Sequence, residues 1–174
     1  MDRRQIKSRK AILQAFCALL KQKDYGRITV QEIIDAADVG RTTFYAHFET
    51  KEFLLQTLCS DLFDHIKNYD HADSNDPKAV FLHLFNHLRR NDNNLLDLLS
   101  SPNNALFMTY FRANLKDLAA GLLQSNGGLP NDLAAAYVSA AFVETAGYWI
   151  NSSLVQTEKQ VNDCFFALVG HLLK

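Results

Sequence analysis

A short segment near the N-terminal end of the chain carries side chains that can bind DNA. Arg41 can donate two hydrogen bonds to guanine, and Thr42 and Thr43 can donate to a base or contact a thymine methyl group. Tyr45 and His47 can donate to phosphate oxygens. Each residue alone is also typical of an ordinary solvated surface, but together and in this order they indicate a DNA contact.

Residues around this segment can support the contact. Gly40 allows the backbone to approach a duplex closely. Lys51 adds a positive charge near the phosphates, and a helix that begins at Thr29 presents unpaired N–H groups to an anion. Phe44 and Phe48 are four residues apart, so they share one face of a helix and can hold the segment against its neighbours.

Local signals predict a helix-turn-helix that positions these side chains. Thr29 and Glu32 form a capping box, in which each side chain satisfies a backbone N–H of the other residue, so a helix begins at Thr29. Residues 38–40 predict a turn, and a second short helix then covers residues 41–47. Helices this short need each other's packing, as in the helix-turn-helix motif.

Apolar residues at helical spacing continue through the rest of the chain. The 3 prolines and 7 glycines are too few for an all-β fold, and residues 68–76 form the clearest polar linker. We predict an all-α protein. Besides an N-terminal helix that ends within residues 21–27 and the two short helices, we predict helices at residues 50–67, 77–90, 102–124, 130–151 and from residue 157 to residue 174.

The charge of the chain is divided unevenly. Of the 174 residues, 48% are apolar and 21% are charged, which suits a globular core, and the net charge is only −1. Residues 1–51 contain 10 Lys/Arg and 6 Asp/Glu, a net charge of +4, whereas the remaining residues contain 8 and 13, a net charge of −5. This asymmetry favours an N-terminal part that approaches a polyanion, and a chance fluctuation of surface charge is the other interpretation.

Other functional classes lack their signals in the sequence. The apolar runs are too short to cross a membrane, and the three widely spaced cysteines, Cys17, Cys59 and Cys164, indicate neither a disulfide framework nor a zinc site, so we expect a cytoplasmic protein. Phosphate-binding loops and hydrolase motifs are absent, which predicts no enzyme and no cofactor. His83 and His87 are four residues apart but lie well off the apolar stripe of their helix, so we expect a solvated pair and predict no metal site.

The N-terminal pattern resembles the DNA-binding domain of the tetracycline-repressor (TetR/AcrR) family. The matching residues cover about the first third of the chain and read Val30-x2-Ile33-x3-Ala37-x-Val39-x-Arg41-x-Thr43-Phe44-Tyr45-x-His47-Phe48-x2-Lys51-x2-Leu54. The chain departs from the family at Asp38, where glycine is frequent, and at Gly40, where serine or threonine is frequent. Asp38 tolerates a left-handed turn, whereas Gly40 leaves only its N–H for a phosphate. The resemblance implies an all-helical homodimer on a near-palindromic operator, with a three-helix DNA-binding domain in residues 1–50 and a helical regulatory and dimerisation domain in residues 51–174. It also implies DNA contacts from Thr29, Arg41, Thr42, Thr43, Tyr45, His47 and Lys51.

The C-terminal part is expected to sense a ligand and to dimerise. It holds 14 of the 19 aromatic residues, which can line an apolar pocket or fill a helical core. Nine of the fourteen residues from 160 to 173 are apolar, which is too many for one buried face and predicts a two-fold four-helix interface with residues 130–151. The pocket candidates are Phe81, Phe85, Phe107, Tyr110, Phe111, Phe142 and Trp149. The interface candidates are Tyr137, Val138, Ala141, Phe142, Val161, Phe165, Leu168 and Leu172.

These observations predict a DNA-binding transcription regulator, specifically a homodimeric repressor that a small apolar or aromatic ligand releases from its operator. The ligand would favour a conformer in which the two DNA-reading helices are wrongly spaced. Helix 50–67 is expected to transmit this change, since it alone joins Phe48 to the C-terminal core. The alternative is a co-regulator of the same kind whose C-terminal domain docks a protein partner and binds no small ligand, and a packed core without a pocket would favour it. A small helical enzyme is a third interpretation, which no motif supports.

Overall fold

Helix boundaries follow local capping signals wherever the sequence carries them. Thr29 Oγ1 accepts a hydrogen bond from the N–H of Glu32 at 3.2 Å, and Glu32 Oε2 accepts one from the N–H of Thr29 at 2.9 Å. Asp38 ends the same helix in the left-handed region with φ +51°, where the αL cap satisfies otherwise unpaired helical carbonyls. The capping box and the turn predicted from the sequence are therefore both present.

The structure, a computed structural model, describes residues 2–68, 76–90, 95–100, 105–124 and 128–173. Within these residues the regular elements are α-helices and short 3₁₀ turns, so the predicted all-α fold is confirmed. The elements in chain order are α1 (Arg3–Gln22), η1 (Tyr25–Arg27), α2 (Val30–Ala37), α3 (Arg41–His47), α4 (Lys51–Asn68), α5 (Pro77–Arg90), α6 (Leu95–Ser100), α7 (Ala105–Leu122), α8 (Asn131–Asn151), α9 (Glu158–Val169) and η3 (Gly170–Leu172).

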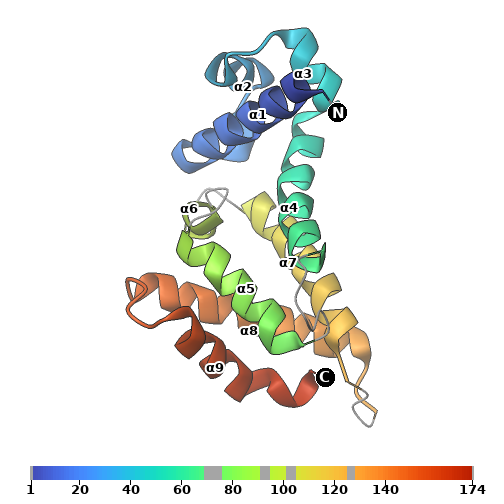
Figure 1. The fold of residues 1–174 in the computed structure, drawn as a ribbon, viewed down its shortest axis with the longest axis vertical. Coiled ribbons are helices and arrows are strands. Elements are labelled where there is room, and N and C mark those ends of the chain that lie inside the picture. The colour runs from blue at the N-terminus through green and yellow to red at the C-terminus, as the bar shows by residue number, and fades with distance from the viewer. Residues whose placement is uncertain (1, 69–75, 91–94, 101–104, 125–127, 174) are drawn as a thin grey trace.

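Helices α1, α2 and α3 form one group, which we call the head (Figure 1). Its centre consists of fully or almost fully buried side chains from all three helices and from the residue after α3: Ile12, Phe16, Ile33, Phe44 and Phe48. Helix α4 leaves the head and runs along α7, and the ion pair between Arg9 of α1 and Asp61 of α4 spans 2.7 Å. The head is thus tied to α4 by a covalent connection and by an ion pair.

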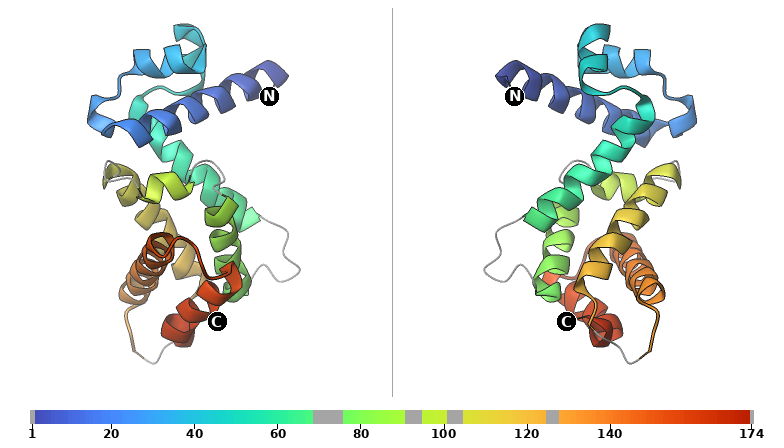
Figure 2. Two further views of the ribbon diagram at one scale, coloured as in Figure 1. Left: turned by 90° about the vertical axis from the view of Figure 1, so that its left-hand side faces the viewer. Right: turned by 90° about the vertical axis from the view of Figure 1, so that its right-hand side faces the viewer.

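Helices α5 to α9 form the second group, which we call the body (Figure 2). Helix α7 packs on α8, α5 packs on α9, and α8 packs on α9. Phe81 and Phe85 of α5 lie 4.8 Å, between ring centroids, from Phe165 of α9 and Phe142 of α8 respectively. Aromatic contacts therefore hold the three helices together.

Some features of the body differ from the prediction. Helix α6 is absent from the predicted elements, and its contact with α1 is a second connection between head and body, so the expectation that α4 alone joins them is wrong. The last helix ends at Val169 and continues only as the turn η3, after which Leu173 forms an isolated bridge with Leu123.

Two predicted boundaries concern residues that the structure does not describe. Most of the linker predicted at residues 68–76 lies outside the described ranges. So do residues 102–104, the predicted start of the helix that is described from Ala105 onwards. In the described part of the chain, every helix is too short or too polar to cross a membrane.

Candidate nucleic-acid interface

Helix α3 has one buried side and one exposed side. Phe44 is 0% exposed in the centre of the head, whereas Arg41, Thr42 and Tyr45 are exposed, Tyr45 at 44%. The guanidinium carbon of Arg41 lies 5.8 Å from the centroid of the Tyr45 ring, so the two side chains lie together on the outer side. Of the predicted DNA-contacting side chains on α3, those of Arg41, Thr42 and Tyr45 therefore face solvent.

The helix begins at Gly40 without a side-chain cap. Gly40 is exposed and has the extended conformation φ −74°, which any residue can adopt. A Cβ atom built there would meet only Thr43 Oγ1, at 3.8 Å. Glycine is therefore not required for the fold at this position, and its N–H and Cα are open to a close approach.

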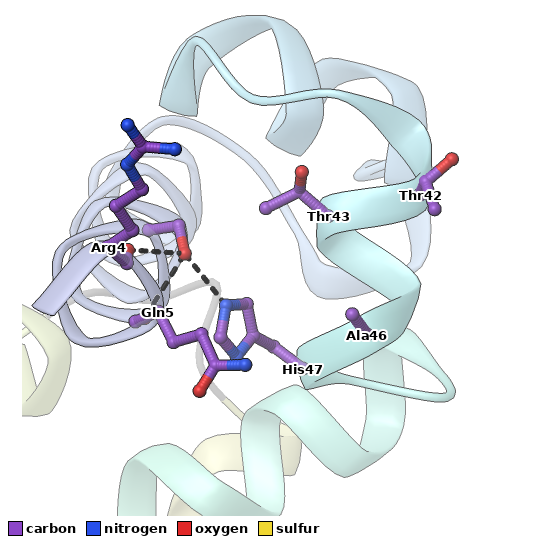
Figure 3. Close-up of a pocket in the computed structure, with 7 residues that line it drawn as sticks. Arg4, Gln5, Thr42, Thr43, Ala46 and His47 are labelled. Carbon is purple, nitrogen blue, oxygen red and sulfur yellow. Dashed lines mark hydrogen bonds between the residues drawn. The ribbon is translucent and has the colours of Figure 1, made fainter. Parts of the chain in front are cut away.

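A polar hollow lies between α3 and the first half of α1 (Figure 3). His47 is hydrogen-bonded to α1, since its Nε2 lies 2.7 Å from Ser8 Oγ. His47 and Thr43 are both half-buried. Arg4 and Thr43 point toward the same side in Figure 3, whereas Thr42 lies on the side of α3 away from α1. The hollow has a volume of about 630 Å³ and is lined by Arg4, Gln5, Ser8, Thr42, Thr43, Ala46 and His47.

The α1 residues of this hollow were not among the predicted site residues. Arg4, Gln5 and Ser8 lie more than thirty positions before α3, and only the packing of α1 against α3 brings them together. The concentration of basic residues in the first ten positions was the available signal. Arg4 therefore adds a second positive charge, besides that of Arg41, to the exposed surface around α3.

Two predicted DNA contacts have intramolecular partners in this structure. The hydroxyl of Thr29 is engaged in the capping box with Glu32. Lys51 Nζ donates to the carbonyl oxygens of Tyr25 and Ile28, both at 2.7 Å, and lies 4.1 Å from the centroid of the Tyr25 ring. Burial lowers the pKa of the Lys51 ammonium. Lys51 thus secures η1 against the start of α4, and its contact with phosphate stays a prediction.

Glu32 joins the start of α2 to the end of α1. Its carboxylate forms an ion pair with Lys23 and accepts hydrogen bonds from the N–H and the hydroxyl of Thr29. The hydrogen bond from Lys23, followed by those from Thr29, lowers the pKa of Glu32 from 4.5 to about 2. The ionised form is therefore the one that the folded head stabilises.

The head is consequently expected to lose stability in acid. Because the pKa of Glu32 is lower in the folded state, its contribution is fully present above pH 4.5 and is lost as the pH falls toward about 2. We expect the difference in Tm between the natural protein and Glu32→Gln to shrink over this range. Thermal unfolding at several pH values measures it, with Glu49→Gln at an exposed position as the control for the loss of one carboxylate. A difference in Tm that is unchanged down to about pH 2 would contradict the assignment.

Most of the predicted pocket residues lie in the packed interior of the body. Phe81, Phe85, Phe142 and Trp149 are 0% exposed and contact one another. Tyr110 is half-buried on α7, where its hydroxyl donates to Glu52 of α4, and this hydrogen bond raises the pKa of Tyr110. Phe107 and Phe111 stack on each other at 5.8 Å, and both are buried.

A small cavity lies beside this aromatic core, between α6, α7 and α8. Its volume is about 160 Å³, and Phe111 is the one predicted pocket residue among those that line it. The sequence did not single out its other lining residues, because all but one are small or apolar residues, which carry no pocket signal. They are Leu99, Met108, Val143, Glu144, Ala146, Gly147 and Ile150.

The predicted interface residues divide into two groups. Tyr137 at 57% and Leu168 at 62% are exposed, and Ala141 is half-buried. The others lie on the sides of α8, α9 and η3 that pack within the same chain, where α8 packs on α7 and α9 packs on α5 and η3. The residues that are therefore buried in the core of the single chain are Val138, Phe142, Val161, Phe165 and Leu172.

The predicted histidine pair also has a different setting from the expected one. His83 and His87 are half-buried rather than fully solvated, and their Nε2 atoms lie 3.1 Å apart. His65 of α4, which sequence analysis did not connect with them, lies against both rings.

Comparison with known proteins identifies both parts of the chain. Residues 12–58 match the family of bacterial regulatory proteins named tetR, and residues 75–170 match a family described as a transcriptional regulator C-terminal region. The uncharacterized HTH-type transcriptional regulator YxbF of Bacillus subtilis (strain 168) is 39% identical over 71 residues, which cover 38% of this chain and 19% of YxbF. The chain thus spans about a fifth of the length of that curated relative.

Solved structures agree with this assignment. A TetR transcriptional regulator from Streptococcus agalactiae 2603V is 31% identical, with a TM-score of 0.73 over 97% of this chain and 96% of that chain. NalD, the secondary repressor of the MexAB-OprM multidrug efflux pump in Pseudomonas aeruginosa, shares the fold at 16% identity, with a TM-score of 0.63 over 99% of each chain. With its N-terminal and C-terminal parts both matched, the chain belongs to the TetR family of DNA-binding transcriptional regulators.

Proposed function

We propose that the protein is a homodimeric repressor of the cytoplasm, in which residues 1–50 bind a near-palindromic operator and residues 51–174 dimerise and sense a small ligand. The observation that carries the proposal is the two-sided structure of α3. Phe44 anchors the helix in the head, while Arg41, Thr42 and Tyr45 are exposed together on its other side. A helix held in this way can enter the major groove of a duplex.

Each exposed group has a chemical role in this proposal. Arg41 donates to O6 and N7 of one guanine, and Thr42 and Thr43 contact the neighbouring bases. Tyr45 and the N–H of Gly40 bind phosphate oxygens, as do positively charged groups of α1 such as Arg4. Thr29, His47 and Lys51 act mainly by holding the head in shape, and any phosphate contact they make is additional.

Selection of bound sequences from random duplexes tests this function. The intact protein is expected to enrich an inverted repeat whose half-site centres are about 10 base pairs, or a multiple of that, apart, since two-fold symmetry places the two α3 helices in grooves on one side of the duplex. Reporter expression from a promoter that carries the repeat then distinguishes a repressor from an activator. Enrichment of no sequence, or of a single half-site, would contradict the proposal.

Arg41→Ala is expected to weaken binding to the selected operator by about 1–3 kcal/mol and to relax the preference at one base pair. Binding to random duplex should fall much less, because a bidentate contact with guanine is lost and only one charge is removed. Titration of both DNAs at one salt concentration measures the two effects. Arg112→Ala, at an exposed position of α7, removes the same charge outside the head and is the control. Equal losses on operator and random DNA would show that Arg41 contacts phosphate instead.

Dimerisation is supported by an exposed apolar stripe on α8 and by an exposed leucine on α9. Leu133, Tyr137 and Tyr148 of α8 are 60%, 57% and 69% exposed, and their spacing places them on one side of the helix. Leu168 of α9 is 62% exposed. Large apolar side chains gathered in this way are typical of a surface that another subunit covers.

Ligand sensing is supported by the position of the cavity. It is bounded by α6, which contacts α1 of the head, and by α7, whose Tyr110 is hydrogen-bonded to Glu52 and Gln56 of α4. A ligand that prefers one arrangement of α6 and α7 therefore shifts the orientation of the head. At about 160 Å³ the cavity suits a ligand of about one aromatic ring. Operator titrations with and without single-ring compounds test this step, and an affinity that no such compound changes would favour the protein-docking alternative.

A further inference from the structure

Three histidines from two helices meet in the body, outside the proposed DNA and ligand sites. His65 lies in the last turns of α4, and His83 and His87 lie on α5. One ring nitrogen of each lies within 4.8 Å of the others, and the Nε2 atoms of His83 and His87 are 3.1 Å apart. The ring of His65 has its centroid 5.5 Å from that of His83 and 5.0 Å from that of His87. The three imidazoles thus converge on one point.

The fold itself produces this convergence. His83 and His87 are separated by one helical turn, so their side chains lie side by side on α5. The neighbouring positions Leu84, Phe85 and Leu88 are 0% exposed and hold that helix in the core, which fixes the direction of the histidine side. Helix α4 packs against α5 and brings His65 to the same place. Both histidines of α5 are half-buried and His65 is exposed, so the cluster is accessible from solvent.

We propose that His65, His83 and His87 bind a divalent transition-metal ion such as Zn²⁺. Neutral imidazole nitrogen is a preferred ligand of Zn²⁺, at about 2.0–2.1 Å. Two nitrogens that share such an ion are about 3.0 Å apart at a right angle and about 3.4 Å apart at a tetrahedral angle, and the 3.1 Å between His83 and His87 falls in this range. The proposed site requires the exposed His65 side chain to move its nitrogen from within 4.8 Å of the other two to the same distance. Three protein ligands leave a position for water, as in open zinc sites.

The bound ion would connect the end of α4 to α5. Since α4 carries the head at its other end, occupancy would fix the direction of α4 relative to the body (Figure 1). This consequence rests on the proposed function, whereas the binding of the ion does not. The ion would then be a second input that biases the spacing of the two α3 helices in the dimer.

Metal titration of the intact, tag-free protein tests the site. We expect Zn²⁺ to bind at one ion per chain by calorimetry, and Co²⁺ to give visible absorption bands of a nitrogen-ligated ion. His65→Asn and His87→Asn should each weaken binding by more than about tenfold. The control is His171→Asn, which removes an exposed histidine of η3 and should leave binding unchanged. Circular dichroism establishes that each variant folds, and His65, being exposed, is the position least able to disturb folding.

The outcomes distinguish the binding of the ion from its coupling to the head. Equal Zn²⁺ affinity of the natural protein, His65→Asn and His87→Asn would overturn the site. If Zn²⁺ binds as expected and alters operator affinity in the natural protein but not in His65→Asn, both the site and its coupling to the head are supported. If Zn²⁺ binds and operator affinity does not change, the site stands and the coupling is overturned. If selection from random duplexes finds no operator, the proposed function fails, while the calorimetry still reports on the site.

Discussion

Replacing Phe44 by alanine is expected to lower the free energy of unfolding by about 3–5 kcal/mol and to abolish operator binding. Phe44 is 0% exposed, and its ring lies 6.1 Å from that of Phe48 in the centre of the head. The α3 helix that it anchors has only 7 residues, too few to persist without packing. The loss therefore removes both stability and the surface that would contact DNA.

Denaturant unfolding followed by far-ultraviolet circular dichroism measures this effect. The only tryptophan, Trp149, lies in the body, so its fluorescence reports on the other end of the molecule. Tyr45→Ala is the matched control, because it removes the adjacent aromatic ring from an exposed position and should cost about 1 kcal/mol or less. A loss of stability in Phe44→Ala no larger than that in Tyr45→Ala would show that Phe44 is not the anchor.

Leu168→Glu is expected to convert the dimer into a monomer and to weaken operator binding by about 10²–10⁴-fold. The first effect follows because Leu168, at 62% exposure, belongs to the surface proposed to meet the second subunit, where a buried unpaired carboxylate is unfavourable. The second follows because a monomer loses the gain from engaging two half-sites at once. The fold of the single chain should be unchanged, since the side chain is exposed there.

Sedimentation at several protein concentrations measures the first effect and operator titration the second. Lys159→Gln is a close control, because it changes the net charge by the same amount at an exposed position of α9 that lies about half a turn away from Leu168. The proposal fails if Leu168→Glu remains a dimer, or if the natural protein sediments as a monomer at every concentration.

The helix-turn-helix could be predicted from the sequence because its signals are local. Thr29 and Glu32 cap a helix within four residues, and Asp38 can adopt the left-handed conformation that ends it. The four-residue spacing of Phe44 and Phe48 correctly predicted which side of α3 is buried. In each case the residues that decide the structure are close together in the chain, so their pattern carries the information.

Features that depend on distant partners could not be predicted in this way. The carbonyl oxygens that Lys51 contacts carry no side-chain signature, since every residue has one. His65 meets His83 only because α4 packs against α5. Helix α6 has a repeated pair of leucines but only 6 residues, which is too short for a periodic pattern to stand out.

The apolar composition of residues 160–173 predicts burial but does not identify the chain that provides it. A helix that is apolar over much of its circumference must be covered on more than one side, but the pattern does not say by which chain. In the structure Val161 and Phe165 are covered within the chain, and Leu168 is left at the surface. The candidate dimer surface is therefore narrower than the sequence indicated.

Two attachments of the head to the rest of the described chain limit how it can move. One attachment is the continuous backbone from α3 into α4, supported by the ion pair of Arg9 with Asp61, and the other is the contact of α6 with α1. A rigid object held at two separate points cannot swing in every direction, and it turns most easily about the line that joins them. We therefore expect the head to rotate mainly about one axis. In the proposed dimer, this rotation would change the distance between the two α3 helices along a single path.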